Sequence, residues 1–289
     1  MSRVWDIPIH DSTRLRDARV AAEAASALAG FTSHRTANTA LVVAGLATDL
    51  LEHAGGGRVL INLVERAERA GDREISVQLC ALDHGSGMPD VAAALRDGYT
   101  TAPGSLGAGL GTCLRISSAF GLHSTAGRGT VALARVDQHP AVRQQSAAAL
   151  GVTVGAVNVP LAHGEHSGDA VTWARHGSRL TLLHADGLGH GPKATHACAV
   201  AVDELHRTAH LPPAEILRRL HTALCPTGGA AAAITQLDAG TRRLRFAGVG
   251  NIGARLRDAG SPALPVRDDT SVTVVAPILR RSAHGPSSA

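Results

Sequence analysis

The sequence DHGSGM at residues 83–88 and the glycine-rich sequence GSLGAGLG at residues 104–111 are the most informative stretches of the first half of the chain. The first follows an alternating run at 74–82 that predicts a β-strand, and the second opens a short helix predicted at 112–120. A carboxylate at a strand end can accept a hydrogen bond from an exocyclic amine. Glycines let backbone N–H groups approach phosphates, and a helix N-terminus favours anions. This combination favours a nucleotide site.

The predicted elements on either side of these stretches define the rest of the first half. Apolar residues at helical spacing predict two helices before them, and short alternating runs predict strands and a closing hairpin. The expected ranges are helices at 12–29, 33–53 and 112–120, and strands at 59–64, 74–82, 122–124 and 129–136. This order predicts an α/β sandwich, in which one mixed or antiparallel sheet is covered on one face by helices.

Two other kinds of nucleotide site fit the sequence less well. A Rossmann fingerprint needs Gly-x-Gly-x-x-Gly directly after a strand, and the stretch at 99–103 that precedes Gly107 is not a predicted strand. A Walker-type loop needs Gly-Lys-Ser/Thr, and the chain has a single lysine, Lys193, in another context.

The first half resembles the Bergerat-type ATP-binding fold shared by gyrase, Hsp90 and histidine kinases (GHKL), and most of all the RsbT and RsbW anti-sigma kinases, over about residues 12–136. The resemblance implies that ATP with Mg is bound by Asp49, Asp83, Gly85, Gly87, Gly107, Gly109, Gly111 and Thr130. In the family, the second helix carries a catalytic Glu and, four residues later, an Asn that holds Mg. Gly45 and Asp49 stand at these positions. Gly45 cannot take a proton, so the resemblance implies nucleotide binding and puts phosphoryl transfer in doubt.

The second half is expected to begin after a linker and to be rich in strands at both ends. The expected strands lie at 152–161, 170–174, 179–185, 230–237, 243–247, 252–256 and 272–276, and the expected helices at 190–209 and 213–225. Strands that flank a helix pair predict two sheets with helices packed outside.

Three acidic residues of the second half stand at or beside predicted strand ends. They are Asp169 in SGDA, Asp186 in ADGLGHG and Asp268 in RDDT. Carboxylates brought together in this way can bridge two hard metal ions, which activate water for an in-line displacement at phosphorus. Each acid could instead be a simple turn former.

These motifs look like those of PPM-type phosphatases, most of all the SpoIIE and RsbX branch, over about residues 154–276. The resemblance implies Mn or Mg, one ion or two, held by Asp169, Asp186, Asp268 and the carbonyl of Gly187, with Asp169 and Asp186 as catalytic acids. Whether Asp268 or its neighbour Asp269 binds metal stays open. The family's Ser-Asp-Gly segment is missing, because only residues 254–267 separate Gly253 from Asp268. One ligand is therefore expected to be absent.

Together these features predict an α+β protein with an ATP-binding domain at 1–138, a linker at 139–150, a shortened PPM-type β-sandwich flanked by helices at 151–278 and a disordered tail at 279–289. The predicted function is metal-dependent dephosphorylation of a serine or threonine in a phosphorylated regulatory protein, an anti-sigma antagonist or stress-signalling scaffold. The alternative is a non-catalytic nucleotide-binding regulator in which both modules are degenerate.

Composition excludes several other classes of function. The net charge is only +4, from 28 basic and 24 acidic residues, and the basic residues are scattered, which disfavours nucleic-acid binding. No run of 18 apolar residues occurs, which disfavours a membrane span. The four cysteines form no C-x-x-C pair, so we expect reduced cysteines in a cytoplasmic protein.

Overall fold

The computed structural model describes residues 3–67, 74–95, 109–139, 154–159, 167–255 and 272–274. The first half contains β1 (Val4–Ile9), α1 (Thr13–Leu28), α2 (Ser33–Ala54), β2 (Gly57–Ala67), β3 (Glu74–Leu82), α3 (Val91–Ala94), α4 (Gly109–Ile116), β4 (Ala119–Thr125) and β5 (Gly129–Asp137). The second half contains β6 (Asp169–His176), β7 (Arg179–Gly187), α6 (Pro192–Thr208), α7 (Pro213–Leu224), β8 (Ala230–Asp238), β9 (Arg243–Val249), β10 (Gly253–Arg255) and β11 (Val272–Val274). The mixed α+β class is confirmed.

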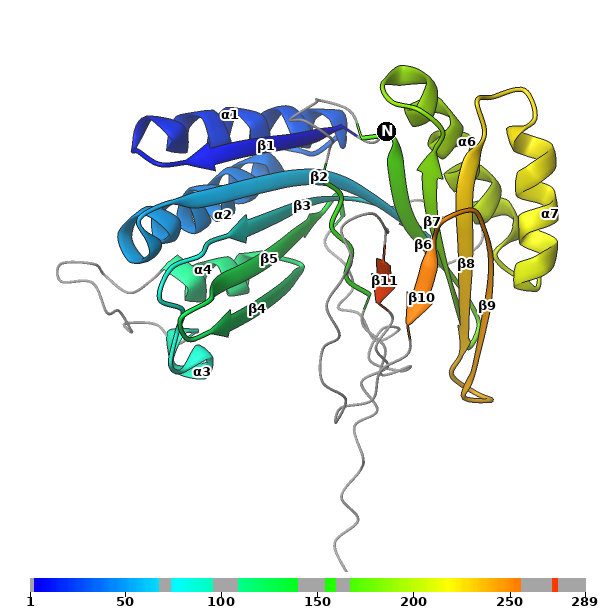
Figure 1. Ribbon diagram of the computed structural model, residues 1–289. Helices are drawn as coiled ribbons and strands as arrows, with labels where there is room; N and C mark the ends of the chain where they lie inside the picture. Colours follow the sequence, from blue (N-terminus) through cyan, green and yellow to red (C-terminus); the bar gives the residue numbers. More distant parts are fainter. Residues whose placement is uncertain are drawn as a thin grey trace, which may run out of the picture.

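One sheet of nine strands runs through both halves (Figure 1). Its strand order is β4-β5-β3-β2-β6-β7-β8-β9, and β1 pairs with β2. The pairs are antiparallel except for β2 with β6, which are parallel where Arg66 lies opposite Trp173 and Ala67 opposite Ala174. The two halves therefore share a continuous sheet, whereas the sequence predicted separate sheets for them.

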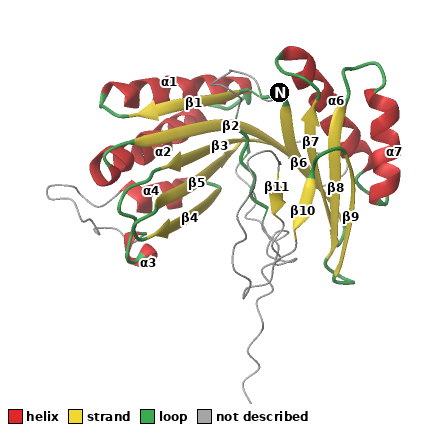
Figure 2. Ribbon diagram, viewed as in Figure 1, coloured by secondary structure: helices red, strands yellow, loops and turns green. Residues whose placement is uncertain are grey.

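In the first half, α1 and α2 pack on one face of the sheet, as the sequence predicted (Figure 2). Helix α2 begins where the Thr32 hydroxyl accepts a hydrogen bond from the Arg35 backbone N–H, and it ends at Gly55 in the left-handed conformation. Val42 and Leu46 of its apolar stripe are buried in the core between the helices and the sheet. Strand β1 was not among the predicted elements.

In the second half, α6 and α7 cover one face of the sheet, and their apolar residues form a core with β7 and β8. Successive side chains of β8 point to opposite faces of the sheet and pack in two different cores. Ala232 and Ile234 face the helices, whereas Ala231 and Ala233 contact Ile252 just before β10. Strand β10 pairs in parallel with β11 to form a second, two-stranded sheet. The helices and strands expected here are confirmed at most of their positions.

The prediction of a strand at 152–161 was wrong for its described part, because residues 154–159 do not form a strand. The segment is held by side chains of three neighbouring strands. Asn62 Nδ2, Gln78 Nε2 and Arg135 Nη1 donate to three of its carbonyl oxygens, at 3.0, 2.7 and 3.2 Å. The accepting carbonyls belong to Asn158, Ala156 and Val154 respectively. Every second carbonyl is used, so an extended chain crosses the sheet without joining it.

The expected linker at 139–150 and tail at 279–289 lie outside the described residues, apart from His139. The domain boundaries therefore stay predictions. Among the described residues, no helix is both long and apolar enough to cross a membrane.

Candidate functional site

A pocket of the first half lies among α2, β3, β5 and α4, where the sequence predicted the nucleotide. Its lining includes five of the predicted residues, namely Asp49, Asp83, Gly87, Gly109 and Thr130. Apolar side chains complete the walls, among them Leu46, Leu50, Ala81, Leu122 and Ala132. An apolar slot with a few convergent polar groups is typical of a small-molecule site.

The carboxylate of Asp83 is oriented by two backbone hydrogen bonds. Its Oδ1 accepts from the N–H of Gly85 at 2.8 Å and from the N–H of Thr130 at 3.1 Å. The Asp83 N–H in turn donates to the Thr130 carbonyl at 3.0 Å. Among the described residues nothing donates to Oδ2, so this oxygen can accept a hydrogen bond from a ligand.

The predicted glycines have different roles. Gly87 has φ +70°, and a side chain there would also collide with the Thr125 carbonyl. Gly85 positions Asp83 instead of lining the pocket, and Gly111 is buried inside α4. Gly107 lies outside the described residues, so its role stays a prediction.

Asp49 lies beside α4 in a desolvated position. Burial, together with the neighbouring Glu52, raises its pKa to about 6, while His53 lowers it. Its Oδ2 is buried without a hydrogen-bond partner. A Cβ on Gly109 would lie 3.0 Å from the other oxygen, Oδ1, so a glycine lets the start of α4 approach this carboxylate. An unpartnered buried oxygen here suits a cation.

Gly45, at the position of the family's Glu, faces α4. A Cβ there would lie 3.0 Å from Cys113 Sγ, and the Cys113 side chain is buried at 1% exposure. Burial raises the pKa of the Cys113 thiol to about 12, so this sulfur stays protonated and cannot replace the missing base.

In the second half, the structure brings together Asp169 and Asp186. They lie directly opposite each other on β6 and β7. Burial first, and then the nearby Asp186 carboxyl, raise the pKa of Asp169 to about 6, while a hydrogen bond with Ser167 lowers it. Two carboxyl groups this close repel each other when both are ionised. A divalent cation would remove that repulsion, so these residues fit a hard metal ion.

The other predicted metal ligands are only partly placed. Gly187 follows Asp186 at the end of β7, and its N–H donates to the Gly168 carbonyl at 2.9 Å. Asp268 and Asp269 lie outside the described residues. Within the described ranges, no group of three or more His, Cys, Asp or Glu side chains could hold a metal ion.

Two residues that sequence reasoning missed support the acid pair. Asn158 donates from Nδ2 to the backbone carbonyl of Asp169 at 2.9 Å. The buried Cys198 packs behind the pair, with Sγ 2.9 Å from the carbonyl of Gly168. No motif marks Asn158, because its contact depends on how residues 154–159 cross the sheet.

Comparison with known proteins finds similarity both in sequence and in structure. The chain is 34% identical to the serine/threonine-protein kinase RsbT of Bacillus subtilis (strain 168) over 101 residues, which are 35% of this chain and 71% of that protein. No family model matches.

Two solved structures show local similarity. One is described as the bacterial stressosome, a modular system adapted to control secondary messenger signaling, with 32% identity, a TM-score of 0.28 and coverage of 29% of this chain and 44% of that one. The other is RsbX in complex with magnesium, with 28% identity, a TM-score of 0.28 and coverage of 29% and 42%. The chain thus spans less than half of either protein, and at this TM-score neither match establishes a shared fold.

Proposed function

The chain belongs, through its N-terminal portion, to the family of the serine/threonine-protein kinase RsbT, and on this basis we propose that residues 1–138 form a domain that binds ATP with Mg. The observation that carries the proposal is the orientation of the Asp83 carboxylate at the pocket. Its Oδ1 is fixed by two backbone N–H groups, and its Oδ2 is left for a donor at the pocket. An adenine amine is such a donor. Asp49, with its unpartnered oxygen, would hold the Mg that accompanies the phosphates.

This domain is proposed to bind nucleotide without transferring a phosphoryl group. A transfer step needs a group that takes the proton of the attacking hydroxyl. Gly45 has no side chain, and the thiol of Cys113 next to it stays protonated. Bound nucleotide would then act as a regulatory ligand.

For the second half we propose a phosphatase domain at 151–278 that acts on a serine or threonine phosphate of a regulatory protein, an anti-sigma antagonist or a stress-signalling scaffold. Asp169 and Asp186 would hold Mn or Mg, with the Gly187 carbonyl and Asp268 as further ligands. When bound, the cation supplies positive charge that polarises a phosphoryl oxygen and acidifies water. Ser167 and Asn158 orient the backbone that carries Asp169.

The experiment measures phosphate release from an aryl phosphate with added Mn. Wild type is compared with Asp186→Asn and with Asp17→Asn, a matched change at a surface carboxylate of α1. Mn-dependent turnover that survives in Asp17→Asn and disappears in a folded Asp186→Asn supports the proposal. Turnover by Asp186→Asn at the wild-type rate would refute the assignment.

The second candidate function is a non-catalytic regulator, which the Gly45–Cys113 contact and the short stretch at 254–267 favour. Nucleotide binding separates the two candidates. Absence of turnover in a folded wild-type protein that still binds ATP would establish the regulator.

A further inference from the structure

A second cluster of charged side chains lies near Arg179, at the end of β7 opposite to Asp186. A cavity of about 160 Å³ there is lined by Arg179, Gln236, Asp238, Thr241, Arg243 and Arg245. We propose that this cavity is an anion site that binds a phosphoryl group.

The strand register explains why these side chains meet. Arg179 on β7 lies opposite Asp238 on β8, which lies opposite Arg243 on β9. In the next row of the same face, Gln236 on β8 lies opposite Arg245. Neighbouring strands are about 4.8 Å apart, so the Cα atoms of Arg179 and Arg243 are separated by about 10 Å. Long guanidinium side chains on both sides can reach one anion across that distance.

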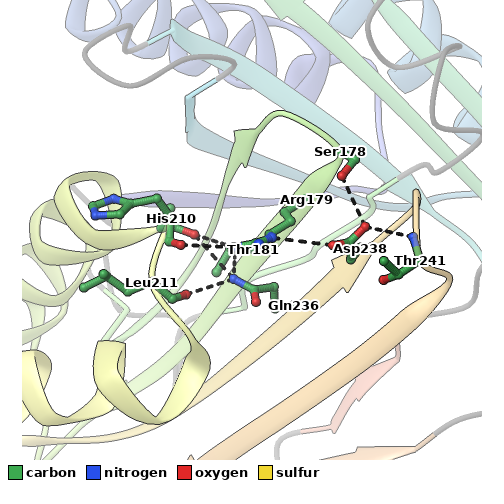
Figure 3. Close-up of polar contacts among 9 residues, drawn as sticks. Ser178, Arg179, Thr181, His210, Leu211, Gln236, Asp238 and Thr241 are labelled. Atoms are coloured by element: carbon green, nitrogen blue, oxygen red, sulfur yellow. Dashed lines mark hydrogen bonds and ion pairs between the residues drawn. The ribbon is translucent and has the colours of Figure 1, made fainter.

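The floor of the cavity is fixed by a hydrogen-bond network (Figure 3). Asp238 accepts from the Thr241 N–H at 3.1 Å and from the Ser178 hydroxyl at 3.2 Å, and forms an ion pair with Arg179 at 3.5 Å. Gln236 is buried at 2% exposure and donates to the Leu211 carbonyl at 3.0 Å. These contacts set the positions of the Asp238 and Gln236 side chains at the floor.

The charges of the cavity do not balance. Arg179 is paired with Asp238 and also donates to the His210 carbonyl at 3.3 Å. Arg243 and Arg245 are exposed and make no ion pair or hydrogen bond in the described parts of the chain. Three guanidinium groups against one carboxylate leave two positive charges, which match the charge of a phosphomonoester dianion near pH 7. Arginine forks suit phosphate oxygens particularly well.

The site is separate from the acid pair. Arg179 and Asp186 stand at opposite ends of β7, seven residues apart, which is about 23 Å at the rise of a strand. A phosphoryl group held by the arginines is thus a different group from one at Asp186. The inference does not depend on the proposed phosphatase activity, because the cavity binds without reacting.

The position of the cavity favours a phosphoryl group carried on a protein side chain over a small free ion. Strand β9 is the edge of the nine-stranded sheet, so a large ligand can reach Arg243 and Arg245 from solvent. Val249, an exposed apolar residue of the same strand, lies on the same face as Arg243 and Arg245 and can contact residues that flank the phosphate.

The test is calorimetric titration of the full chain in EDTA at low salt. The probes are a phosphoserine peptide, its unphosphorylated form and inorganic phosphate. Variants are Arg243→Gln with Arg245→Gln, and as control Arg242→Gln, which removes a charge from the same hairpin but not from the cavity. We expect the double variant to weaken binding of the phosphopeptide about tenfold or more, since charge-assisted hydrogen bonds are lost. The control should change it less than about twofold, and added salt should weaken it.

The arms of the experiment separate the sources of the anion. Binding of the phosphopeptide above inorganic phosphate, with none to the unphosphorylated peptide, supports a phosphorylated protein ligand. Inorganic phosphate binding as tightly as the phosphopeptide restricts the site to the free ion. Equal affinities for both peptides, or equal losses in the double variant and the control, would overturn the proposal. Because EDTA removes divalent ions, these outcomes are independent of the Asp186 assay.

Discussion

The repulsion between Asp169 and Asp186 predicts that removing one carboxylate stabilises the metal-free protein. The pKa of Asp169 is raised from 3.8 to about 6, first by burial and then by Asp186. Because Asp169 is only half-buried and solvent screens part of the interaction, the loss of stability above pH 6 is about 1–2 kcal/mol. Since burial remains in Asp186→Asn, we expect the variant to regain about 1 kcal/mol of the unfolding free energy.

The gain should depend on pH with a definite sign. Between about pH 4 and pH 6 the folded protein holds a proton on Asp169 that the unfolded chain does not, so its contribution to stability is present below pH 4 and is lost as the pH rises through 6. Wild type and variant should therefore be nearly equally stable at pH 4. At pH 7 without divalent ions, Asp186→Asn should unfold about 2–4 °C higher.

Mn should reverse this order. A ligand that binds only the folded state raises its stability in proportion to RT ln(1 + [L]/Kd). Wild type should gain stability with Mn, and Asp186→Asn should gain little, because half of the acid pair is missing. The measurement is thermal unfolding at pH 4 and pH 7 with EDTA or Mn, with Asp17→Asn as the acid-to-amide control. The reasoning is refuted if Asp186→Asn is no more stable than wild type at pH 7 in EDTA.

Three further predictions concern the first half of the chain and the crossing segment. Asp83→Asn should weaken ATP binding about tenfold or more by fluorescence titration, because the amide that replaces Oδ2 repels a donor amine; unchanged affinity would contradict the site. Gly45→Glu should lower stability by about 1–3 kcal/mol in urea unfolding, since its Cβ meets Cys113 Sγ at 3.0 Å, and Cys113→Ala should restore part of that loss. Gln78→Ala should cost about 1–3 kcal/mol by leaving the Ala156 carbonyl without its 2.7 Å donor; an unchanged unfolding midpoint would show that the segment contributes nothing.

Much of the local structure could be read from the chain. Helices α1, α2, α6 and α7 follow from apolar periodicity and from end signals such as Gly55. The resemblance to the RsbT-type kinases pointed to five residues that line one pocket of the first half, namely Asp49, Asp83, Gly87, Gly109 and Thr130. These signals are short-range, because each depends on neighbouring residues within one or two turns.

Strand β1 is an element that local sequence patterns did not predict. It is six residues long, and its buried positions Val4, Ile7 and Ile9 do not alternate strictly. Its strand character comes from pairing with β2, with Val4 opposite Asn62. A short edge element of this kind is specified by its partner more than by its own sequence.

The amino-acid pattern alone indicated the four long helices, most of the strands, and acids and glycines that line one pocket. Three features depend on the folded chain as a whole: β2 and β6 join the halves into one sheet, Asp169 lies opposite Asp186, and Asn158 donates to the Asp169 carbonyl. The Asn62–Asn158 hydrogen bond joins residues 96 positions apart. Strand register and side-chain contacts over such separations depend on how the whole chain packs, and no local pattern encodes them.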